Sequence, residues 1–163
     1  MNNILSLEDA IEWRKSLSGK RLAITNGCFD LLHYGHVYYL SEASKLADEI
    51  LVLVNSDKSV KELKGSNRPI INQYHRTYVL SRLKPVSAVV VFDGKNCSKE
   101  LKALAPDIYF KAGDYNLENM NKEEYSALSL CGTEIVFIPV VSNISTTKII
   151  DKIMSRKNNV EFF

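Results

Sequence analysis

The sequence of 163 residues has few cysteines and no long apolar run, and both shortages exclude whole classes of protein. Its three cysteines, Cys28, Cys97 and Cys131, form no C-x-x-C pair, and an odd number argues against a disulfide framework. No apolar run approaches the roughly 20 residues that a membrane span requires. The N-terminus lacks the basic and apolar regions of a signal peptide. We therefore expect a cytoplasmic protein without a membrane partner.

The chain also lacks an excess of charge of one sign. Its 21 basic residues are nearly balanced by 19 acidic ones, and the net charge is only +2. This balance gives no reason to expect a nucleic-acid partner, although it is compatible with a small anionic substrate. The length suits one domain with a sizeable core. We expect a single domain over residues 1–163, with a short N-terminal helix over 6–17 and a core over 20–154.

Several well-known site motifs are absent from the chain. No G-x-G-x-x-G follows the first apolar segment, and no G-x-x-x-x-G-K-[ST] occurs, which disfavours the usual dinucleotide fold and a P-loop. No cysteine and histidine grouping has zinc spacing. The G-x-S-x-G elbow of serine hydrolases is missing. Of the kinds of site considered, these absences leave a phosphate-binding site that acts without a covalent nucleophile.

Apolar segments alternate with helical patterns along most of the chain. Strands are predicted over residues 21–25, 50–54, 88–92, 108–110 and 134–140, and helices over residues 6–17, 36–46, 73–83, 98–104 and 145–154. The polar and basic residues 57–71 predict a loop with at most one helical turn. This alternation predicts an α/β fold, a Rossmann-like, doubly wound parallel sheet of about five strands. Its polar clusters follow strands, so they should gather at one edge of the sheet, where such folds bind ligands.

The stretch from Asn26 to His36 is the most informative part of the chain, because it lies where a strand gives way to a helix. It holds two of the three histidines, His33 and His36, with Gly35 between them. A helix N-terminus carries free amides and a partial positive charge, which favour phosphate. Histidines there can donate hydrogen bonds to phosphate oxygens and to the charge that develops in phosphoryl or nucleotidyl transfer. The alternative is an ordinary loop that contains histidines.

A second basic element follows, formed by Lys58, Lys61, Lys64, Arg68 and Arg76. Lysines on a loop beside a phosphate site could close over a triphosphate and neutralise it. The alternative is a solvated charged face, which we prefer for Lys58 and leave open for Lys61. Lys64 precedes Gly65 and a proline turn, so we interpret it as functional. For Arg76, on a predicted helix, the alternative is a surface salt bridge.

Two further clusters follow later strands. In the segment from Lys111 to Tyr115, Gly113 would let the backbone approach a ligand and Asp114 could hold a metal, a ribose or a sugar hydroxyl; the alternative is a simple turn. Ser145, Thr146 and Thr147 begin the last predicted helix, where capping explains one hydroxyl. Three hydroxyls together indicate a second phosphate contact.

Taken together, these elements resemble the nucleotidyltransferase superfamily that carries the H-x-G-H signature, here His33-Tyr34-Gly35-His36 backed by Ser145-Thr146-Thr147. The cytidylyltransferases for glycerol phosphate and phosphocholine share both elements. Residues 25–30, 63–69 and 106–115 are more similar to the heptose 1-phosphate adenylyltransferases of lipopolysaccharide-core biosynthesis. The resemblance covers about residues 5–153. Many bacteria fuse this activity to a sugar kinase, and this chain looks like the stand-alone form.

The resemblance implies transfer of AMP from ATP to D-glycero-β-D-manno-heptose 1-phosphate, which gives ADP-heptose and pyrophosphate by direct in-line attack. It gives His33 and His36 the role of stabilising the transition state, and Lys64 that of bridging the attacking and leaving phosphates. It assigns nucleotide binding to Gly27, Cys28, Phe29, Gly35, Arg76, Asp114, Ser145 and Thr146, and substrate binding to Asp30, Lys61 and Lys111. It also implies Mg²⁺ on the triphosphate, without a dedicated carboxylate cage, and a homodimer.

The chain departs from the heptose pattern at two places. Ala112 stands where that pattern has a glycine before the one that corresponds to Gly113. The segment Ile144-Ser145-Thr146-Thr147 has the sequence that is typical of the cytidylyltransferases. Val140 stands where those enzymes have an arginine, and Asp114-Tyr115 replaces their Asp-Trp pair, which favours adenine over cytosine. The alternatives are a cytidylyltransferase of the glycerol 3-phosphate type, an FAD-synthetase-like enzyme, and a catalytically silent nucleotide-binding module.

Overall fold

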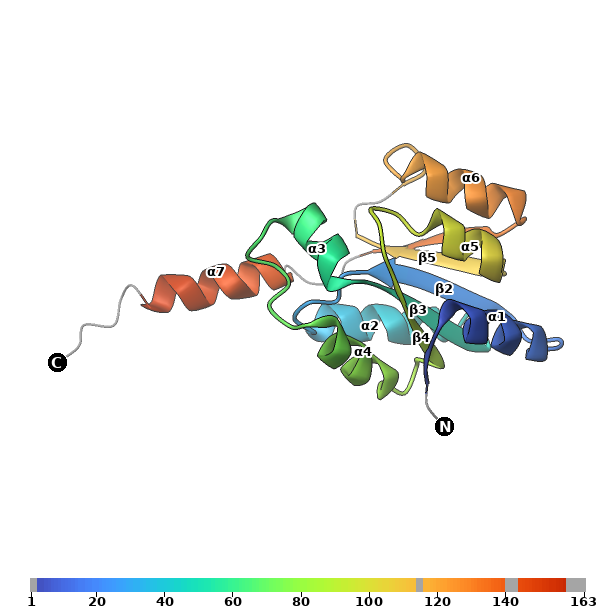
Figure 1. Cartoon of the computed structure of the whole chain (residues 1–163), viewed down its shortest axis with the longest axis horizontal. Helices are drawn as coiled ribbons and strands as arrows, with labels where there is room; N and C mark the ends of the chain where they lie inside the picture. Colours follow the sequence, from blue (N-terminus) through green and yellow to red (C-terminus); the bar gives the residue numbers. More distant parts are fainter. Residues whose placement is uncertain (1–2, 114–115, 140–143, 158–163) are drawn as a thin grey trace.

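The computed structural model describes residues 3–113, 116–139 and 144–157, which fold into a parallel sheet with helices on both faces (Figure 1). In these residues the sheet has six strands in the order β1-β4-β3-β2-β5-β6. The strands are β1 Ile4–Leu5, β2 Leu22–Gly27, β3 Glu49–Asn55, β4 Ala88–Phe92, β5 Ile108–Ala112 and β6 Glu134–Ile138. The helices are α1 Leu7–Ser16, α2 Tyr34–Ala43, α3 Asp57–Lys64, α4 Gln73–Ser81, α5 Ser98–Leu104, α6 Lys122–Leu130 and α7 Thr146–Lys157.

The central strands are apolar on both faces, as strands covered on both sides must be. In β3, Leu51 and Leu53 point into one core with α1, α5 and α6, whereas Val52 and Val54 point into the other with α2 and α4. This alternation is the two-residue period of a strand. The predicted α/β fold with a doubly wound parallel sheet is therefore confirmed.

Strand β2 is the point where the strand order reverses, since it pairs with β3 on one side and with β5 on the other. Connections from neighbouring strands therefore leave in opposite directions beside it, which opens a crevice at the carboxyl ends of the strands. The segment from Asn26 to His36 follows β2 directly and lies at this crevice.

The structure differs from the sequence prediction in three elements. The two-residue strand β1 adds a sixth strand through the pairs Ile4↔Val89 and Leu5↔Val90. Helix α6, capped by Asn121, has no counterpart in the prediction. The loop predicted over residues 57–71 is wrong for its first half, because Ser56 caps the eight-residue helix α3, whose Val60 is buried.

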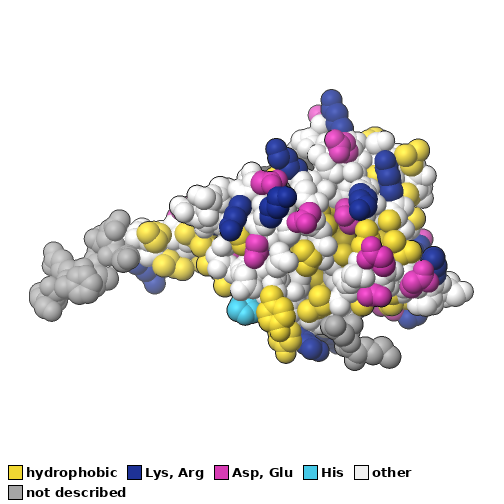
Figure 2. All heavy atoms as spheres, in the orientation of Figure 1, with side chains coloured by type: hydrophobic (Ala, Val, Ile, Leu, Met, Phe, Trp, Pro, Cys, Tyr) yellow, Lys and Arg dark blue, Asp and Glu magenta, His cyan; other side chains and the backbone are white. Residues whose placement is uncertain are grey.

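Helix α7 extends away from the rest of the molecule (Figure 1), and hydrophobic side chains are visible along it (Figure 2). Ile153 and Met154 on this helix are more than half exposed. Among the described residues, every helix is too short or too polar to cross a lipid bilayer.

The packing of α3 generates a testable prediction. Val60→Ala removes an apolar side chain of α3 that is fully buried, and should lower the free energy of unfolding by about 2 kcal/mol. Glu62→Ala, at an exposed position of the same helix, should change it by less than about 0.5 kcal/mol. Urea denaturation of both variants provides the measurement. Equal stability of the two variants would show that α3 does not pack as described.

Candidate active site

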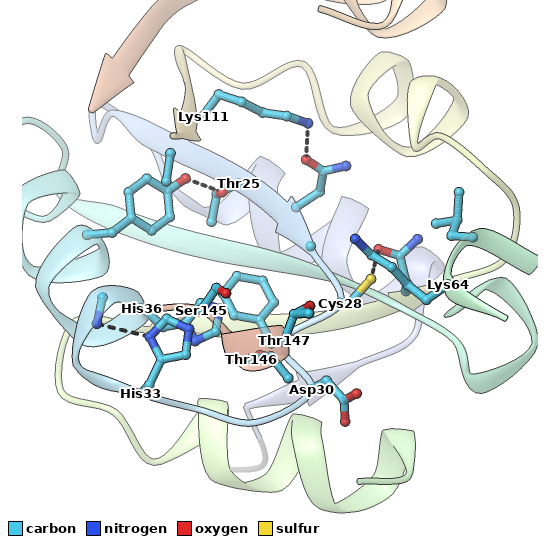
Figure 3. Close-up of a pocket in the computed structure, with 18 of the residues that line it drawn as sticks. Thr25, Cys28, Asp30, His33, His36, Lys64, Lys111, Ser145, Thr146 and Thr147 are labelled. Carbon is cyan, nitrogen blue, oxygen red and sulfur yellow. Dashed lines mark hydrogen bonds between the residues drawn. The ribbon is translucent and has the colours of Figure 1, made fainter. Parts of the chain in front are cut away.

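A cleft of about 740 Å³ opens at the carboxyl ends of the strands. Its size is that of a small-molecule site. The loops after the strands and the first residues of α2 and α7 line it, as Figure 3 shows for 18 of its residues. The gathering of polar clusters at one edge of the sheet, expected from the order of strands and helices, is therefore what the structure has.

His33 caps helix α2, since its Nδ1 accepts a hydrogen bond from the Gly35 amide at 3.1 Å. An accepting Nδ1 is unprotonated, so the neutral ring carries its proton on Nε2, which is left to donate. A Cβ at position 35 would lie 3.1 Å from the His33 ring. Glycine at this position therefore allows the ring to reach the helix end.

His36 stacks on His33 with 3.9 Å between the ring centroids, and its ring is also 5.2 Å from that of Phe29, tilted by 47°. Burial, reinforced by the charge of His33, lowers the pKa of His36 to about 4, and burial also lowers the pKa of His33. Among the described residues, the buried Nδ1 of His36 has no hydrogen-bond partner. His36 is therefore neutral at pH 7 and too weakly basic to be an effective general base, and the N–H of a neutral imidazole can donate a hydrogen bond.

Phe29, whose ring lies near that of His36, has a strained backbone. Its φ is 47°, in the left-handed region that bulky residues avoid. Its ring lies so close to Gly27 that a Cβ there would be 3.1 Å away. Strain of this kind persists only where the surroundings enforce it, and it concentrates at functional sites. Gly27 and Phe29 thus shape the loop between β2 and α2.

Cys28, in the same loop, lines the cleft beside Asn55 and Lys64 (Figure 3). Burial raises the pKa of the Cys28 thiol, and the nearby positive charge of Lys64 only partly offsets this. The thiol is therefore protonated at neutral pH and is a weak nucleophile.

Asp30 lines the cleft but its carboxylate is fully engaged within the protein. Its Oδ2 accepts a hydrogen bond from Arg68 Nε at 2.6 Å, and its Oδ1 accepts from the amides of Ile70 and Ile71. Burial acts to raise the pKa of Asp30, but these hydrogen bonds outweigh it and hold the pKa below its ordinary value. Asp30 therefore fastens the segment after α3 to the loop that carries the histidines.

Arg76 is fully buried and does not line the cleft. Its guanidinium donates to the Cys28 carbonyl at 2.5 Å, to the Ile71 carbonyl at 2.9 Å and to Asp57 at 2.8 Å. The salt bridge considered for this residue is present, with Asp57, but the arginine side chain is buried and not on the surface. Arg76 thus connects three segments next to the site, and its predicted role in nucleotide binding stays a prediction.

The lysines of the site occupy different positions. Lys64, the last residue of α3, lines the cleft, whereas Lys61 is exposed and not among its lining residues. Lys111 lies on the far side of the cleft from the histidines (Figure 3), where its Nζ is 2.9 Å from Asn26 Oδ1 and 3.2 Å from the buried Glu124. Its charge is thus largely compensated, while Lys64 has no ion-pair partner among the described residues.

The hydroxyls at the start of α7 tie this helix to the histidine loop. Ser145 Oγ accepts a hydrogen bond from the Lys148 amide at 3.2 Å and caps the helix. Thr146 Oγ1 donates to the Leu31 carbonyl at 3.2 Å. All three hydroxyl residues line the cleft beside His33 and His36 (Figure 3), so two helix N-termini meet there.

Further residues line the cleft that the sequence analysis did not single out as site residues: Tyr39, Asn55, Lys95, Asn119, Asn121 and Glu124. Asn55 could have been found, because it is the last residue of β3 and therefore lies at the same edge.

Asp114, which the sequence analysis assigned to nucleotide binding, lies outside the described residues. Within the described part of the chain, no group of three acidic, histidine or cysteine residues could hold a metal ion.

Comparison with known proteins decides the family. Residues 24–152 match the sequence profile of the family described as Cytidylyltransferase-like. The chain belongs to this family. It is therefore a nucleotidyltransferase, and the predicted enzyme class and superfamily are confirmed.

Among curated proteins, this nucleotidyltransferase is similar to the bifunctional protein HldE of Koribacter versatilis, with 40% identity over 146 residues, 90% of this chain and 29% of that protein. It is 43% identical to the bifunctional protein HldE of Campylobacter fetus over 92% of this chain and 31% of that protein. The chain thus spans less than a third of the length of these relatives.

Two solved structures share the fold. The lipopolysaccharide core biosynthesis protein from Thermoplasma volcanium is 28% identical and superposes with a TM-score of 0.62, over 77% of this chain and all of that one. Pantoate-beta-alanine ligase from Francisella tularensis has a TM-score of 0.57 over 96% of this chain and 78% of that one, with 13% identity. The second likeness concerns the fold alone.

The low pKa of His36 predicts how the stability of this nucleotidyltransferase depends on pH. Between pH 6.5 and 4 the unfolded chain binds a proton at His36 that the folded protein does not, so the free energy of unfolding should fall as the pH is lowered. This contribution is about 2 kcal/mol after allowance for the partial exposure of the ring.

The test compares urea denaturation at pH 7 and pH 4.5. His36→Asn should lose less stability over this range than the unmodified protein, whereas His75→Asn, at an exposed histidine, should lose as much as the unmodified protein. Parallel losses in all three proteins would contradict the assignment of a neutral, buried His36.

Proposed function

We propose that the protein transfers AMP from ATP to a sugar 1-phosphate, with D-glycero-β-D-manno-heptose 1-phosphate as the preferred acceptor, and releases ADP-heptose and pyrophosphate. The observation that carries the transfer is the stacked pair of neutral histidines at the N-terminus of α2, facing a cleft with Lys64 on its other side. The heptose acceptor is supported by the sequence resemblance of residues 25–30, 63–69 and 106–115, and by the likeness to two HldE proteins and to a lipopolysaccharide core biosynthesis protein.

In this reaction an oxygen of the sugar phosphate attacks the α-phosphorus, and the bond from that phosphorus to the oxygen bridging to the β-phosphorus breaks. Negative charge grows on the α-phosphoryl oxygens and on the leaving pyrophosphate. His33 donates from Nε2, His36 from its protonated nitrogen, and the amides at the starts of α2 and α7 add their partial charge. Lys64 neutralises the two phosphate groups that approach each other. The protein acts by positioning and charge stabilisation, without a covalent intermediate.

Magnesium belongs to the substrate in this proposal and enters on the triphosphate. The carboxylate of Asp30 is occupied by Arg68 and two amides, and Glu124 pairs with Lys111, so the protein offers neither as a free ligand. Phosphate oxygens and water would complete the coordination, and the ion would neutralise charge on the triphosphate.

The second candidate is a cytidylyltransferase, favoured by the sequence Ile144-Ser145-Thr146-Thr147 and by the family's description. Pyrophosphate release separates the two, measured with ATP or CTP and with heptose 1-phosphate or glycerol 3-phosphate. We expect turnover with ATP and heptose 1-phosphate. Turnover with CTP alone would contradict adenylyl transfer, and turnover with ATP and another phosphate monoester would contradict the heptose acceptor.

The role of the histidines is tested by His36→Ala. Loss of a donor that acts in the transition state should lower kcat by about 100- to 1,000-fold, with a smaller effect on the Kd for ATP. Steady-state kinetics and calorimetric titration with ATP give the two values, and His75→Ala is the matched control. An equal loss in binding and in rate would make His36 a ground-state ligand only. If His33→Ala changed neither value, the assigned site would be wrong.

A further inference from the structure

Arg68 lines the cleft, and the mechanism above does not use it. We propose that Arg68 binds the phosphate group of the acceptor, in a subsite separate from that of the triphosphate, and that Asp30 is the positioning residue that aims it. This inference rests on the proposed function insofar as the acceptor is a phosphate monoester.

Asp30 fixes the orientation of the Arg68 side chain. Its Nε donates to Asp30 Oδ2 at 2.6 Å, and the Asp30 side chain is only 1% exposed. The other carboxylate oxygen accepts from the amides of Ile70 and Ile71, so Asp30 is itself fixed on the same segment. A guanidinium held at Nε by a buried carboxylate has a defined plane, which spares the entropy of ordering it when a ligand binds.

The ion pair with Asp30 uses only Nε of Arg68 and leaves its two terminal nitrogens for other partners. Across the described residues, neither terminal nitrogen of Arg68 has a hydrogen-bond partner, although the side chain is only 16% exposed. These nitrogens carry four N–H groups in a planar fork that matches two oxygens of a phosphate. An oriented fork whose terminal nitrogens have no protein partner, at the wall of a ligand cleft, fits a phosphate dianion.

Two anions enter the proposed reaction, and the position of Arg68 favours the phosphate of the acceptor over the triphosphate. The triphosphate is proposed to bind at the N-termini of α2 and α7, next to His33 and His36. Arg68 comes from another part of the chain, four residues beyond Lys64 and past Gly65, whose φ of 94° turns the backbone at the end of α3. Transfer brings two anions together, with Lys64 between them. Lys111 is compensated by Glu124, and Lys95 is an exposed lysine of the cleft wall, whereas Arg68 is the cation that a buried carboxylate orients.

The experiment must separate phosphate binding from the attachment of the loop. Arg68→Gln alone leaves the buried Asp30 charge without its ionic partner, which can displace the segment. The double variant Asp30→Asn with Arg68→Gln replaces the ion pair by two amides. The new asparagine oxygen can still accept from the amides of Ile70 and Ile71, and its side-chain amide can donate to the new glutamine. Arg82→Gln, at an exposed arginine of the α4 end, is the matched control.

Calorimetric titration with inorganic phosphate, in the presence of saturating α,β-methylene-ATP, measures the subsite directly. We expect the Kd for phosphate to rise by about 10- to 100-fold in the single and the double variant, as for loss of hydrogen bonds to a charged group. The Kd for α,β-methylene-ATP should change less than about threefold, and Arg82→Gln should match the unmodified protein.

Three results would overturn the inference: a double variant that keeps its affinity for phosphate, an equal loss of affinity for α,β-methylene-ATP, or no binding of millimolar phosphate to the unmodified protein. The first would make Arg68 a loop anchor, and the second would assign it to the triphosphate. Failure of heptose 1-phosphate as a substrate, with the expected phosphate result, would refute the proposed sugar and leave this subsite in place.

Discussion

The site depends on the buried guanidinium of Arg76. Catalytic loops lack the repeating hydrogen bonds of helices and sheets, so their backbone must be fixed by other partners. Arg76 supplies them to three segments at once, through the carbonyls of Cys28 and Ile71 and the carboxylate of Asp57. Asp30 adds a second connection between the histidine loop and the segment after α3. Together these two charged residues place the histidines and Lys64 on facing sides of one cleft.

This rigid frame suits a reaction in which the protein supplies no atom to the product. His36 has a pKa of about 4, so it donates a hydrogen bond at neutral pH rather than accepting a proton. Burial keeps the Cys28 thiol protonated despite Lys64 nearby. Because these side chains are poor nucleophiles and bases, the proposed transfer relies on orientation of two phosphates and neutralisation of their charge.

Much of this architecture could be predicted from the sequence, because buried parallel strands such as residues 50–54 are continuous apolar runs and their polar ends meet at one edge. Helix α3 was missed because Val60 is its lone buried apolar residue, so the basic residues dominate the pattern. Helix α6 buries Glu124, which breaks an amphipathic period. The roles of Asp30 and Arg76 could not be predicted, since each has a partner far along the chain: Arg68 lies 38 residues from Asp30, and Cys28 lies 48 residues from Arg76.

Direct transfer is tested most directly by the stereochemistry at the α-phosphorus. With the Sp diastereomer of ATPαS and the acceptor identified by pyrophosphate release, a single in-line attack predicts inversion in the nucleotide-sugar product. Retention would indicate two displacements and a nucleotide attached to the protein, at Cys28 or at a histidine. That result would contradict the interpretation of the cleft as a site that only positions its two substrates.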